Sequence, residues 1–507
     1  MGTWFIIITS LCIPALLKLL FDLLSTPDSN LKHTKIKGKL PPGPFTFPII
    51  GNFLWLRKTF SDLEPILRNL HAKYGPVVTL PIGLRPAIFV RSHSLAHQAL
   101  VQNGAVFTDR PAALPTENLV SSNQHNINTA AYGPTWRVLR RNLAYEMLHP
   151  SRLKSFSHAR SRALHILVSF LKSHSQCGDC QLANHFQYSM FCVLVFMCFG
   201  DNVDEKKIRE IEMVVRELLV SLEGFGILDF WPRLGKILFW NRWKELKRLW
   251  KAQEDLLVPL IRAITTKDNQ HQQAPTYVET LIDLELPEEK RKLKEGEMVT
   301  LCSEFLAAGT DTTWTALEWI MANLVKHPHV QEKLFAEIKE VAGGAEVIKE
   351  EELERMPYLK AVVLEGLRRH PPAHFVLPHA VTEETTLGGY VVPRNATVNF
   401  LVAEMGWDPE VWEDPMGFKP ERFVEDGKVV FDIAGSKEIK AMPFGVGRRM
   451  CPGSGLAMLH LEYFVANLVW NFEWASVEGD GVDLSEKYEF TTMMKYPLRA
   501  SLSSRHK

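Results

Sequence analysis

The sequence has no excess charge of either sign, because 58 Lys and Arg residues balance 58 Asp and Glu residues in a chain of 507. Without excess positive charge nothing drives binding along a phosphate backbone, which argues against nucleic acid as a partner. Gly and Pro, at 30 residues each, show no low-complexity bias, and 46% hydrophobic with 23% charged residues is ordinary for a globular protein. Disorder, collagen and coiled coil are thereby excluded for the bulk of the chain.

Cysteine is also scarce. Seven cysteines, an odd number spread over a large chain, do not make a disulfide framework, so a reducing compartment around the main body is the simpler interpretation. The close pair Cys177 and Cys180 suggests a redox or zinc motif. However, Cys192 and Cys198 lie in an apolar run and no histidine pair stands at finger spacing, so we do not expect a metal site there.

One long hydrophobic run is present, over residues 4–24. As a helix, 21 residues rising about 1.5 Å each cover roughly 30 Å, which is enough to cross a hydrocarbon core. A cleaved signal peptide would need positive charge before the run and a small-residue cleavage site after it, and neither is present. Because lysines follow the run and none precedes it, we expect a single-pass anchor over 1–27 with the body on the cytoplasmic side.

A basic linker and a proline-rich hinge follow over residues 28–45. The hinge reads LPPGP at 40–44, where three prolines fix φ and remove N–H donors, so it cannot continue a helix and acts as a stiff spacer. An ordinary loop is the alternative for this stretch taken alone. Residues 46–507 are then expected to form a single catalytic domain.

Hydrophobic periodicity predicts a body that is mainly α with minor β. A small sheet is expected near 77–90 and around 391–401, where β-rich runs occur. Helices are expected over 61–74, 159–173, 205–222, 242–264, 295–326, 330–341 and 456–472.

The expected helix over 295–326 is long enough to span a domain and must run through the core. Inside it lies AGTDTT at 308–313, in which a glycine and three threonines are poor helix formers, and the threonine hydroxyls can bond to carbonyls of the preceding turn. A distorted turn in a buried helix is typical of a functional site. Close packing of a neighbouring helix against Gly309 is the alternative.

Near the carboxyl end, Cys451 lies in a glycine-rich run, PFGVGRRMCPG at 443–453. The glycines expose backbone amides, Arg449 lies two residues before the sulfur, and a helix N-terminus follows; each feature stabilises a thiolate. Such a thiolate can be a nucleophile, a redox thiol or a metal ligand. A nucleophile would need a nearby general base, and no Cys/His/Asn family signature is present, so metal ligation fits better.

At this point a resemblance becomes explicit. Phe444, Gly447, Arg449, Cys451 and Gly453 match F-x-x-G-x-R-x-C-x-G at every fixed position, and in this the chain resembles the cytochrome P450 haem-thiolate monooxygenases. Other elements of that family follow in its order: WRVLR at 136–140, AGTDTT at 308–313, EGLR at 365–368 and PERF at 420–423. The E-x-x-R pattern alone has no weight, since two other pairs match it, but order and spacing extend the resemblance over nearly the whole chain. The runs GLRRHPP at 366–372, LPHAVTE at 377–383 and AMLHLEY at 457–463 are most similar to the plant A-type branch and its family numbered eighty-nine.

The resemblance implies a cytochrome P450 fold that binds haem b. Cys451 would be the proximal ligand of the iron, which makes it the metal-binding residue of the chain. Thr312 and Asp311 would be catalytic and relay protons during oxygen activation, with helix capping or solvent contact as the alternative for Asp311. Trp136, Arg140 and Arg449 would donate hydrogen bonds to the haem propionates. The full cofactor-binding set is Cys451, Trp136, Arg140, His379, Phe444, Gly445, Arg449 and Ala308.

Two positions depart from the family pattern. Many relatives carry Arg where this chain has His379, so a neutral His would pair with a propionate more weakly and in a pH-dependent way, unless another residue substitutes. Trp407 also replaces a frequent Arg, with no predicted consequence. Glu365, Arg368 and Arg422 are expected to form a buried structural ion-pair group around the cysteine loop.

The sequence has no G-x-G-x-x-G in a βαβ unit and no other flavin-binding stretch, so the electrons would come from NADPH through the flavins of a separate reductase. The resemblance places that flavoprotein and this chain together in the endoplasmic reticulum membrane. Candidates for docking its acidic surface are Arg137, Arg141, Lys440 and Arg448, with an ordinary solvated face as the alternative.

The expected activity is insertion of one oxygen atom from O2 into a hydrophobic small-molecule plant metabolite. A haem-thiolate isomerase or dehydratase, needing no reductase, is one alternative, against which the Asp311 and Thr312 pair argues. A non-catalytic membrane haem-binding protein is another. The implied pocket walls lie at 107–120, 222–228, 307–308, 374–377 and 491–493. Their apolar composition leaves terpenoid, fatty-acyl, phenolic and tetrapyrrole-derived substrates open, because pocket shape selects among them.

Overall fold

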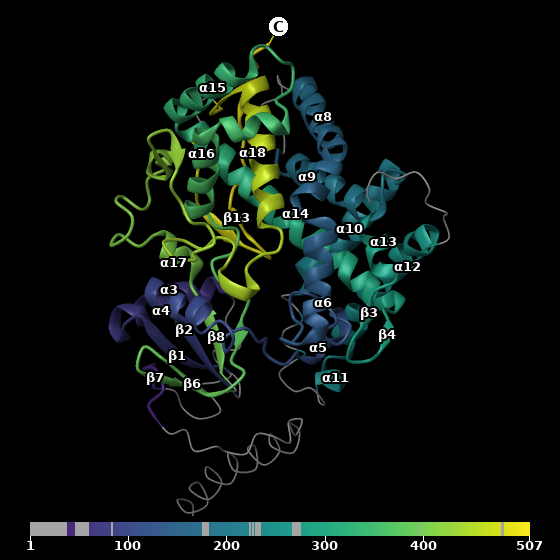
Figure 1. Ribbon diagram of the computed structural model, residues 1–507, viewed down its shortest axis with the longest axis vertical. Coiled ribbons are helices and arrows are strands. Elements are labelled where there is room, and N and C mark those ends of the chain that lie inside the picture. The colour runs from purple at the N-terminus through teal and green to yellow at the C-terminus, as the bar shows by residue number, and fades with distance from the viewer. Residues whose placement is uncertain are drawn as a thin grey trace, which may run out of the picture.

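The computed structural model describes residues 38–45, 60–82, 85–174, 182–222, 225, 228, 235–265, 275–394, 396–477 and 481–506. The expected anchor, most of the basic linker and the pair Cys177 and Cys180 lie outside these residues. Within them the chain is mainly helical with small sheets, as the periodicity predicts (Figure 1).

The four-stranded sheet lies at one end of the molecule, in the order β1-β2-β8-β5 (Figure 1). Strands β1 (Val77–Ile82) and β2 (Arg85–Val90) form an antiparallel hairpin, and β2 pairs in parallel with β8 (Thr397–Phe400). Strand β5 (His379–Ala380) closes the edge antiparallel to β8. Both predicted β regions therefore meet in one sheet, although they lie far apart in the sequence.

The remaining strands form two-stranded pairs. These pairs are β3 (Glu285–Leu286) with β4 (Arg291–Lys292), β6 (Thr385–Leu387) with β7 (Tyr390–Val392), β9 (Val424–Glu425) with β10 (Lys428–Val429), β11 (Phe472–Ala475) with β14 (Ser501–Ser504), and β12 (Glu486–Tyr488) with β13 (Thr492–Met494).

Seven helices agree with the predicted ranges to within two residues at each end. They are α3 (Phe60–Tyr74), α8 (Ser157–His174), α10 (Glu205–Ser221), α12 (Trp240–Thr265), α14 (Glu295–Lys326), α15 (Pro328–Ala342) and α18 (Ser454–Asn471). The further α-helices are α4 (His93–His97), α5 (Pro115–Val120), α6 (Pro134–Asn142), α7 (Pro150–Ser155), α9 (Leu182–Phe199), α11 (Gly235–Leu238), α13 (Tyr277–Ile282), α16 (Pro357–Arg369) and α17 (Val402–Gly406).

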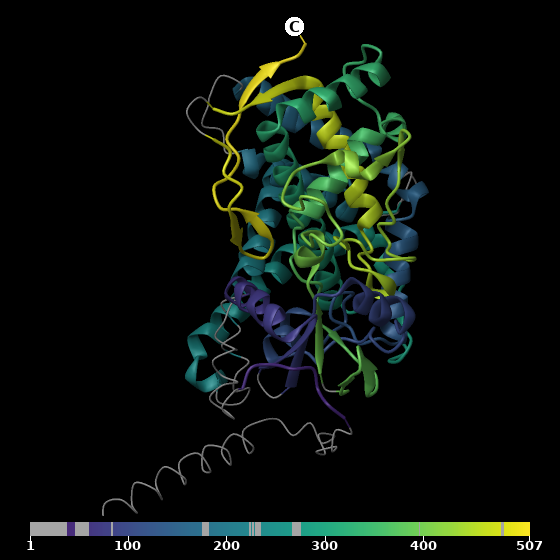
Figure 2. The same cartoon turned by 90° about the vertical axis from the view of Figure 1, so that its left-hand side faces the viewer.

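Helix α14 crosses the middle of the molecule, between α9 and α18 (Figures 1 and 2). Its start is fixed by Glu297, whose carboxylate accepts a hydrogen bond from the backbone N–H of Lys294 at 2.7 Å, and acidic side chains in the first turn favour the positive end of the helix dipole. The helix stays α-helical from end to end, so the expectation of a distorted turn at 308–313 is wrong. Tertiary packing on both sides outweighs the poor helix propensity of these residues.

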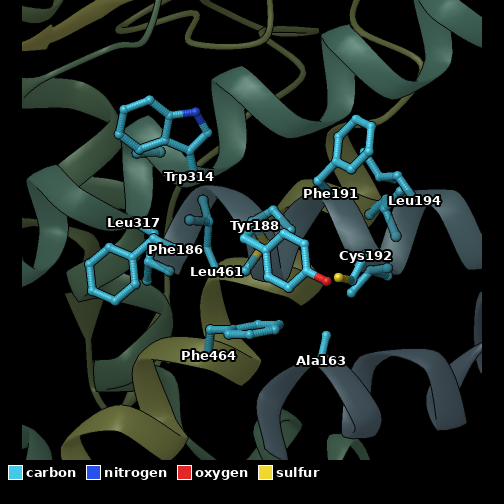
Figure 3. Packing of buried hydrophobic residues seen from close by; sticks show 14 of the residues in the cluster. Ala163, Phe186, Tyr188, Phe191, Cys192, Leu194, Trp314, Leu317, Leu461 and Phe464 are labelled. Atoms are coloured by element: carbon cyan, nitrogen blue, oxygen red, sulfur yellow. The ribbon is translucent and has the colours of Figure 1, made fainter. Parts of the chain in front are cut away.

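Helix α9 is a core helix that the periodicity did not predict. Nearly all of its side chains are buried, so its sequence is apolar all round and lacks an amphipathic pattern. Among the described residues it is the helix long and apolar enough to cross a membrane, but 89% of it is buried inside the fold, which marks it as a core helix. Figure 3 shows its aromatic side chains Phe186, Tyr188 and Phe191 among residues of α14 and α18.

Close approach of α9 to α14 depends on Gly309. A Cβ at this position would lie 2.7 Å from Cδ1 of Leu194, closer than real Cβ contacts allow. The packing explanation for this glycine is therefore confirmed, and it holds alongside any role of the neighbouring threonines.

The ion-pair group expected around the cysteine loop is present. Arg368 and Glu365, both buried on α16, form two hydrogen bonds of 2.7 and 2.9 Å, and Arg422 donates to the same carboxylate at 3.2 Å. Arg368 also donates to the carbonyls of Gly406 and Pro415. Because every charge here has a partner, the group ties α16 to the irregular chain that leads to the cysteine loop.

Candidate haem-thiolate site

The loop that carries Cys451 is held by its own backbone. The N–H of Cys451 donates to the carbonyl of Phe444 at 2.8 Å, and Gly445 and Gly447 adopt φ of +65° and +77°. A Cβ at Gly447 would also lie 2.1 Å from the carbonyl oxygen of Leu100, so this position requires glycine for two reasons. The loop delivers the sulfur just before the first turn of α18.

The surroundings of the sulfur differ from the sequence expectation. Burial raises the pKa of the Cys451 thiol, and the backbone N–H of Gly453 and the cation of Arg140 oppose this only in part. The loop and the nearby cation thus favour the thiolate as expected, but burial of the sulfur has the larger effect. The cation that lowers the pKa of the Cys451 thiol is Arg140, and not Arg449 as the sequence suggests. A bound metal ion would supply the missing charge, which fits ligation better than nucleophilic use.

The part of α14 around Ala308 and Thr312 is not completely buried. Ala308 is exposed, Glu304, Ala307, Asp311 and Thr312 are half-buried, and Phe305, Leu306, Thr310 and Thr313 are buried. Glu304, Ala308 and Thr312 are spaced four apart and share one face. On α18, Ala457 is also half-buried. Small, accessible side chains in two core helices fit a large flat group such as haem.

Three guanidinium groups gather next to this face. Arg449 donates to the carbonyls of Thr108, Ile127 and Ala130 and lies 4.3 Å from the ring centre of Trp136. Arg140 donates to the carbonyl of Met450 at 2.5 Å. The third is Arg110, which donates to the carbonyls of Asn128, Leu377 and Pro378.

These arginines form no ion pair with any carboxylate of the described chain. Burial, together with the repulsion between the two cations, lowers the pKa of Arg110 to about 9. Burial also lowers the pKa of Arg449 to about 10 and that of Arg140 to a lesser extent. The carboxylate of Asp109 opposes these shifts for Arg110 and Arg449, but only in part. Three buried cations that share one nearby carboxylate are costly, so the cluster fits a further anionic group. The two propionates of haem satisfy this requirement, and on this observation the residues present fit the cofactor.

Sequence reasoning missed Arg110. No motif marks it, and the structure brings it to the site through the bridge between Asp109 and Ala380, residues far apart in the sequence. The feature that points to Arg110 is its position beside His379, and this can be seen in the three-dimensional structure but not in the sequence.

His379 is buried and does not meet the expectation for a propionate donor. Its Nδ1–H donates to the carbonyl of Phe107 at 2.6 Å, and burial together with the cation of Arg110 lowers its pKa to about 3. A neutral ring with the proton on Nδ1 has none on Nε2, so His379 has nothing to donate to a carboxylate. Arg110 lies beside His379 and carries a positive charge, so it is the candidate for the residue that substitutes.

The indole N–H of Trp136 is also used in a hydrogen bond within the protein. Its buried indole N–H donates to the carbonyl of Ile127 at 3.2 Å, the same carbonyl that accepts from Arg449. Trp136 therefore orders the loop that contacts the arginine cluster. Trp407 plays a comparable role elsewhere, because its indole N–H donates to the carbonyl of Arg369 at the end of α16, at 2.8 Å.

Thr312 and Asp311 lie on different faces of α14. The hydroxyl of Thr312 donates to the carbonyl of Ala308 at 2.8 Å, whereas the carboxylate of Asp311 accepts from the indole N–H of Trp314 at 2.9 Å. Burial raises the pKa of Asp311. No direct hydrogen bond joins the two side chains in the described structure, so a proton would pass between them through a further group.

A small cavity of about 10 Å³ lies behind this turn, between α9, α10 and α14. This volume accommodates the centre of one water molecule. The Oγ1 of Thr310 and the Nη1 of Arg216 are buried there without a hydrogen-bond partner, and burial raises the pKa of the nearby Glu212. The lining residues are Gln187, Phe191, Glu212, Val215, Arg216, Leu306, Ala307, Thr310 and Asp311.

The four candidate docking residues are all exposed. Arg137 and Arg448 lie on either side of Tyr132, at 5.3 and 5.6 Å from its ring centre, while Lys440 pairs with Glu438 at 3.2 Å. No cluster of three or more potential metal ligands occurs among the described residues.

Comparison with known proteins identifies the family in which this arrangement occurs. The family model described as cytochrome P450 matches residues 41–502. Cytochrome P450 89A9 of Arabidopsis thaliana is 49% identical, over 99% of this chain and 99% of that protein. An isoflavone 2'-hydroxylase of Glycyrrhiza echinata is 32% identical over 92% of each chain.

Among solved structures, a zebra fish cytochrome P450 with progesterone superposes with a TM-score of 0.74 at 23% identity, covering 87% of this chain and 99% of that one. That likeness shows the fold. The family match over nearly the whole chain and the 49% identity to a plant relative confirm the resemblance inferred from the motifs, including its A-type branch and family eighty-nine. The chain belongs to the cytochrome P450 family of monooxygenases.

Proposed function

We propose that this protein is a membrane-anchored haem-thiolate monooxygenase that inserts one oxygen atom from O2 into a hydrophobic small-molecule plant metabolite. Residues 1–27 anchor it in the endoplasmic reticulum membrane, 28–45 form the linker and hinge, and 46–507 form the catalytic domain on the cytoplasmic side. The observation that supports this best is the cluster of three buried arginines near Cys451, which form no ion pair among the described residues.

The residues that hold the cofactor follow from that arrangement. Cys451 ligates the iron of haem b, and Arg110, Arg140 and Arg449 bind the propionates by charge-assisted hydrogen bonds. Phe444 and Gly445 would shape the loop that holds the haem, and Ala308, whose side chain is small, would leave room for it. Haem with a thiolate ligand supplies the chemistry that cleaves the O–O bond of O2.

The chain's own contribution to that chemistry is proton supply. Thr312 presents a hydroxyl on the same face as Ala308, and its proton is shared with the Ala308 carbonyl until a better acceptor is near. Asp311, whose raised pKa favours a held proton, lies beside the cavity lined by Thr310 and Arg216. A water molecule in that cavity would link Asp311 to the part of α14 around Thr312. Protons that pass through it would replace those that Thr312 delivers.

Electrons come from NADPH through a separate flavoprotein reductase. The exposed residues Arg137, Arg141, Lys440 and Arg448 provide positive charge for an acidic partner surface. Relatives 30–32% identical carry the names isoflavone hydroxylase and flavonoid 3'-monooxygenase, which supports oxygen insertion into small plant molecules. These names do not select a substrate for this chain.

The test is to express the full chain with a plant reductase in microsomes and supply a panel of plant metabolites. We expect substrate-dependent NADPH consumption and a product heavier by one oxygen atom in mass spectrometry. An isomerase or dehydratase would turn over without NADPH, and a non-catalytic haem protein would not turn over at all. Either result would contradict the proposal.

A further inference from the structure

The small cavity between α9, α10 and α14 is an internal site for one polar molecule. Its volume of about 10 Å³ accommodates the centre of a single water. Two polar atoms of its lining residues, Oγ1 of Thr310 on α14 and Nη1 of Arg216 on α10, are buried without a hydrogen-bond partner. Because buried polar groups in native proteins are nearly always paired, these two atoms indicate that a water occupies the cavity.

Two carboxyl groups also line the cavity. Asp311 comes from α14, and Glu212 comes from α10, one helical turn before Arg216. A water molecule accepts two hydrogen bonds and donates two. Thr310 and Arg216 can donate to its oxygen, which leaves its two hydrogens for the two carboxyl groups. One water in this cavity can therefore bridge Glu212 and Asp311, which belong to different helices.

Glu212 lies between the cavity and the solvent. It is half-buried, and Arg209 on the preceding turn of α10 is exposed. The charged groups that face it are Arg209 and Arg216 of α10 and Asp311 of α14, and the thiol of Cys192 on α9 is a further titratable neighbour. Burial raises the pKa of Glu212 and outweighs the two arginines, while the charge of Asp311 adds to the rise. Glu212 therefore holds a proton at a higher pH than an ordinary carboxyl group does.

We propose that Glu212 is the residue through which protons enter the site: it takes a proton from solvent and passes it, through the water of this cavity, to Asp311. The inference rests on the proposed function, since it assigns to that function its source of protons. In each transfer the O–H bond of protonated Glu212 breaks as the water takes its proton, and an O–H bond of the water breaks as the Asp311 carboxylate is protonated. The water is unchanged, and solvent reprotonates the carboxylate of Glu212.

The other partners of Asp311 cannot supply protons. The indole N–H of Trp314 donates to its carboxylate at 2.9 Å, but an indole is a donor only, and the guanidinium of Arg216 keeps its protons. Insertion of one atom of O2 reduces the other atom to water and consumes two protons and two electrons, so Asp311 must be reprotonated in every turnover. Glu212 is the remaining titratable residue that lines the same cavity. It touches neither the substrate nor the reacting atoms, so it is a relay residue that acts through Asp311.

The experiment uses the haem-loaded full chain with a plant reductase in microsomes and the metabolite that the panel identifies as a substrate. Glu212→Gln keeps the shape of the side chain and removes its acid group. Glu217→Gln is the matched control, because Glu217 lies on the same helix but is exposed and pairs with Arg248 at 2.8 Å. Product per NADPH, hydrogen peroxide per NADPH and the ratio of the product rates in H2O and D2O are measured for each chain.

We expect Glu212→Gln to lower product per NADPH by about tenfold, which is less than the loss of a group that delivers the proton itself, because solvent still reaches Asp311 slowly. Hydrogen peroxide should rise, and the ratio of the rates in H2O and D2O should increase, since proton transfer then limits turnover. The difference between the natural chain and Glu212→Gln should shrink as the pH rises above the pKa of Glu212, where the natural side chain has no proton to give. Unchanged values in Glu212→Gln, or the same changes in Glu217→Gln, would overturn the proposal.

Two further variants separate a relay from a structural role. Glu212→Asp retains an acid group and should keep more product per NADPH than Glu212→Gln does. A merely structural role predicts the opposite order, because Gln preserves the shape of the side chain better than Asp. Thr310→Val removes the hydroxyl that holds the water and should reproduce the loss even if Glu212→Gln loads haem poorly.

Thermal unfolding gives a measurement that does not depend on turnover. Glu212→Gln, Asp311→Asn and the double variant should shift the melting temperature non-additively, because two carboxyl groups that share one water are coupled. Strictly additive shifts would contradict the shared water even in an active enzyme. The reduced carbon monoxide spectrum and NADPH-dependent turnover of the natural chain are recorded on the same samples, so failure of the monooxygenase assignment is distinguished from failure of this inference.

Discussion

At the scale of single residues, the site is built from groups whose charges the protein does not balance. Cys451 is buried with a raised pKa, and Arg110 and Arg449 are buried with lowered ones. The buried arginines are costly cations that the propionates would compensate, and a haem iron would stabilise the thiolate that burial of Cys451 disfavours. The free-energy cost of burying these groups is thus explained by a bound ligand rather than by the fold.

Cys451→Ala should abolish the red-shifted Soret band of the reduced carbon monoxide complex, because only thiolate ligation gives that electronic signature. The measurement is a difference spectrum of the membrane fraction. Because Cys451 sits in a loop held by backbone bonds, the fold should survive the change. Retention of the band in the variant would contradict the assignment of Cys451 as the ligand.

Thr312→Ala should uncouple the enzyme while leaving haem binding intact. We expect NADPH consumption to persist, product to fall by roughly tenfold to a thousandfold and hydrogen peroxide to rise, which is the scale for loss of one positioned proton-transfer group. If the hydroxyl serves only its bond to the Ala308 carbonyl, the ratio of product to NADPH consumed will stay unchanged, and Thr312 leaves the catalytic set.

Arg110→Gln should weaken haem retention by about tenfold, because one charge-assisted hydrogen bond to a propionate is lost. His379→Gln is the matched control, since Gln can still donate to the Phe107 carbonyl and the neutral ring gives nothing to an anion. The rate of haem transfer to apomyoglobin measures both. Equal transfer rates in the two variants would contradict the role assigned to Arg110.

At the scale of elements, periodicity predicts those helices that have one polar face. The range of α14 agrees at both ends, and α8, α10, α12 and α15 differ by one or two residues. Helix α9 was not predicted, because it is buried on all sides and has no polar face that would create a helical period in the sequence. Motifs likewise located Cys451, Arg140 and Arg449, whereas Arg110 stands in no motif and reaches the site through contacts between distant segments.

Gly309→Ala should test the contact between α9 and α14. The added methyl meets Leu194, and overpacking of this kind costs about 1–3 kcal/mol in the free energy of unfolding. Leu194→Ala in the same chain should recover part of that loss, since it removes the opposing atoms. Thermal unfolding of the single and double variants gives the coupling energy, and strictly additive effects would mean that the two residues do not touch.

At the scale of the whole molecule, the expected division between anchor and catalytic domain makes its own prediction. Removing residues 1–30 should leave the haem spectrum intact and release the protein from membranes, because the proline-rich hinge separates the two parts. Membrane flotation and the carbon monoxide difference spectrum measure the two outcomes. A soluble truncated chain that takes up no haem would show that the parts depend on each other.

The parallel pairing of β2 with β8 has a consequence for the order in which the chain acquires its structure. Ala87 and Thr397, opposite each other in the sheet, are 310 positions apart. At a synthesis rate of about 5–20 residues per second, strand β2 waits roughly 15–60 s for its partner to leave the ribosome. Contacts of such long range also form slowly once both strands exist. During that interval the edge of the β1–β2 hairpin is an unpaired, largely apolar strand that can pair with other chains until β8 covers it.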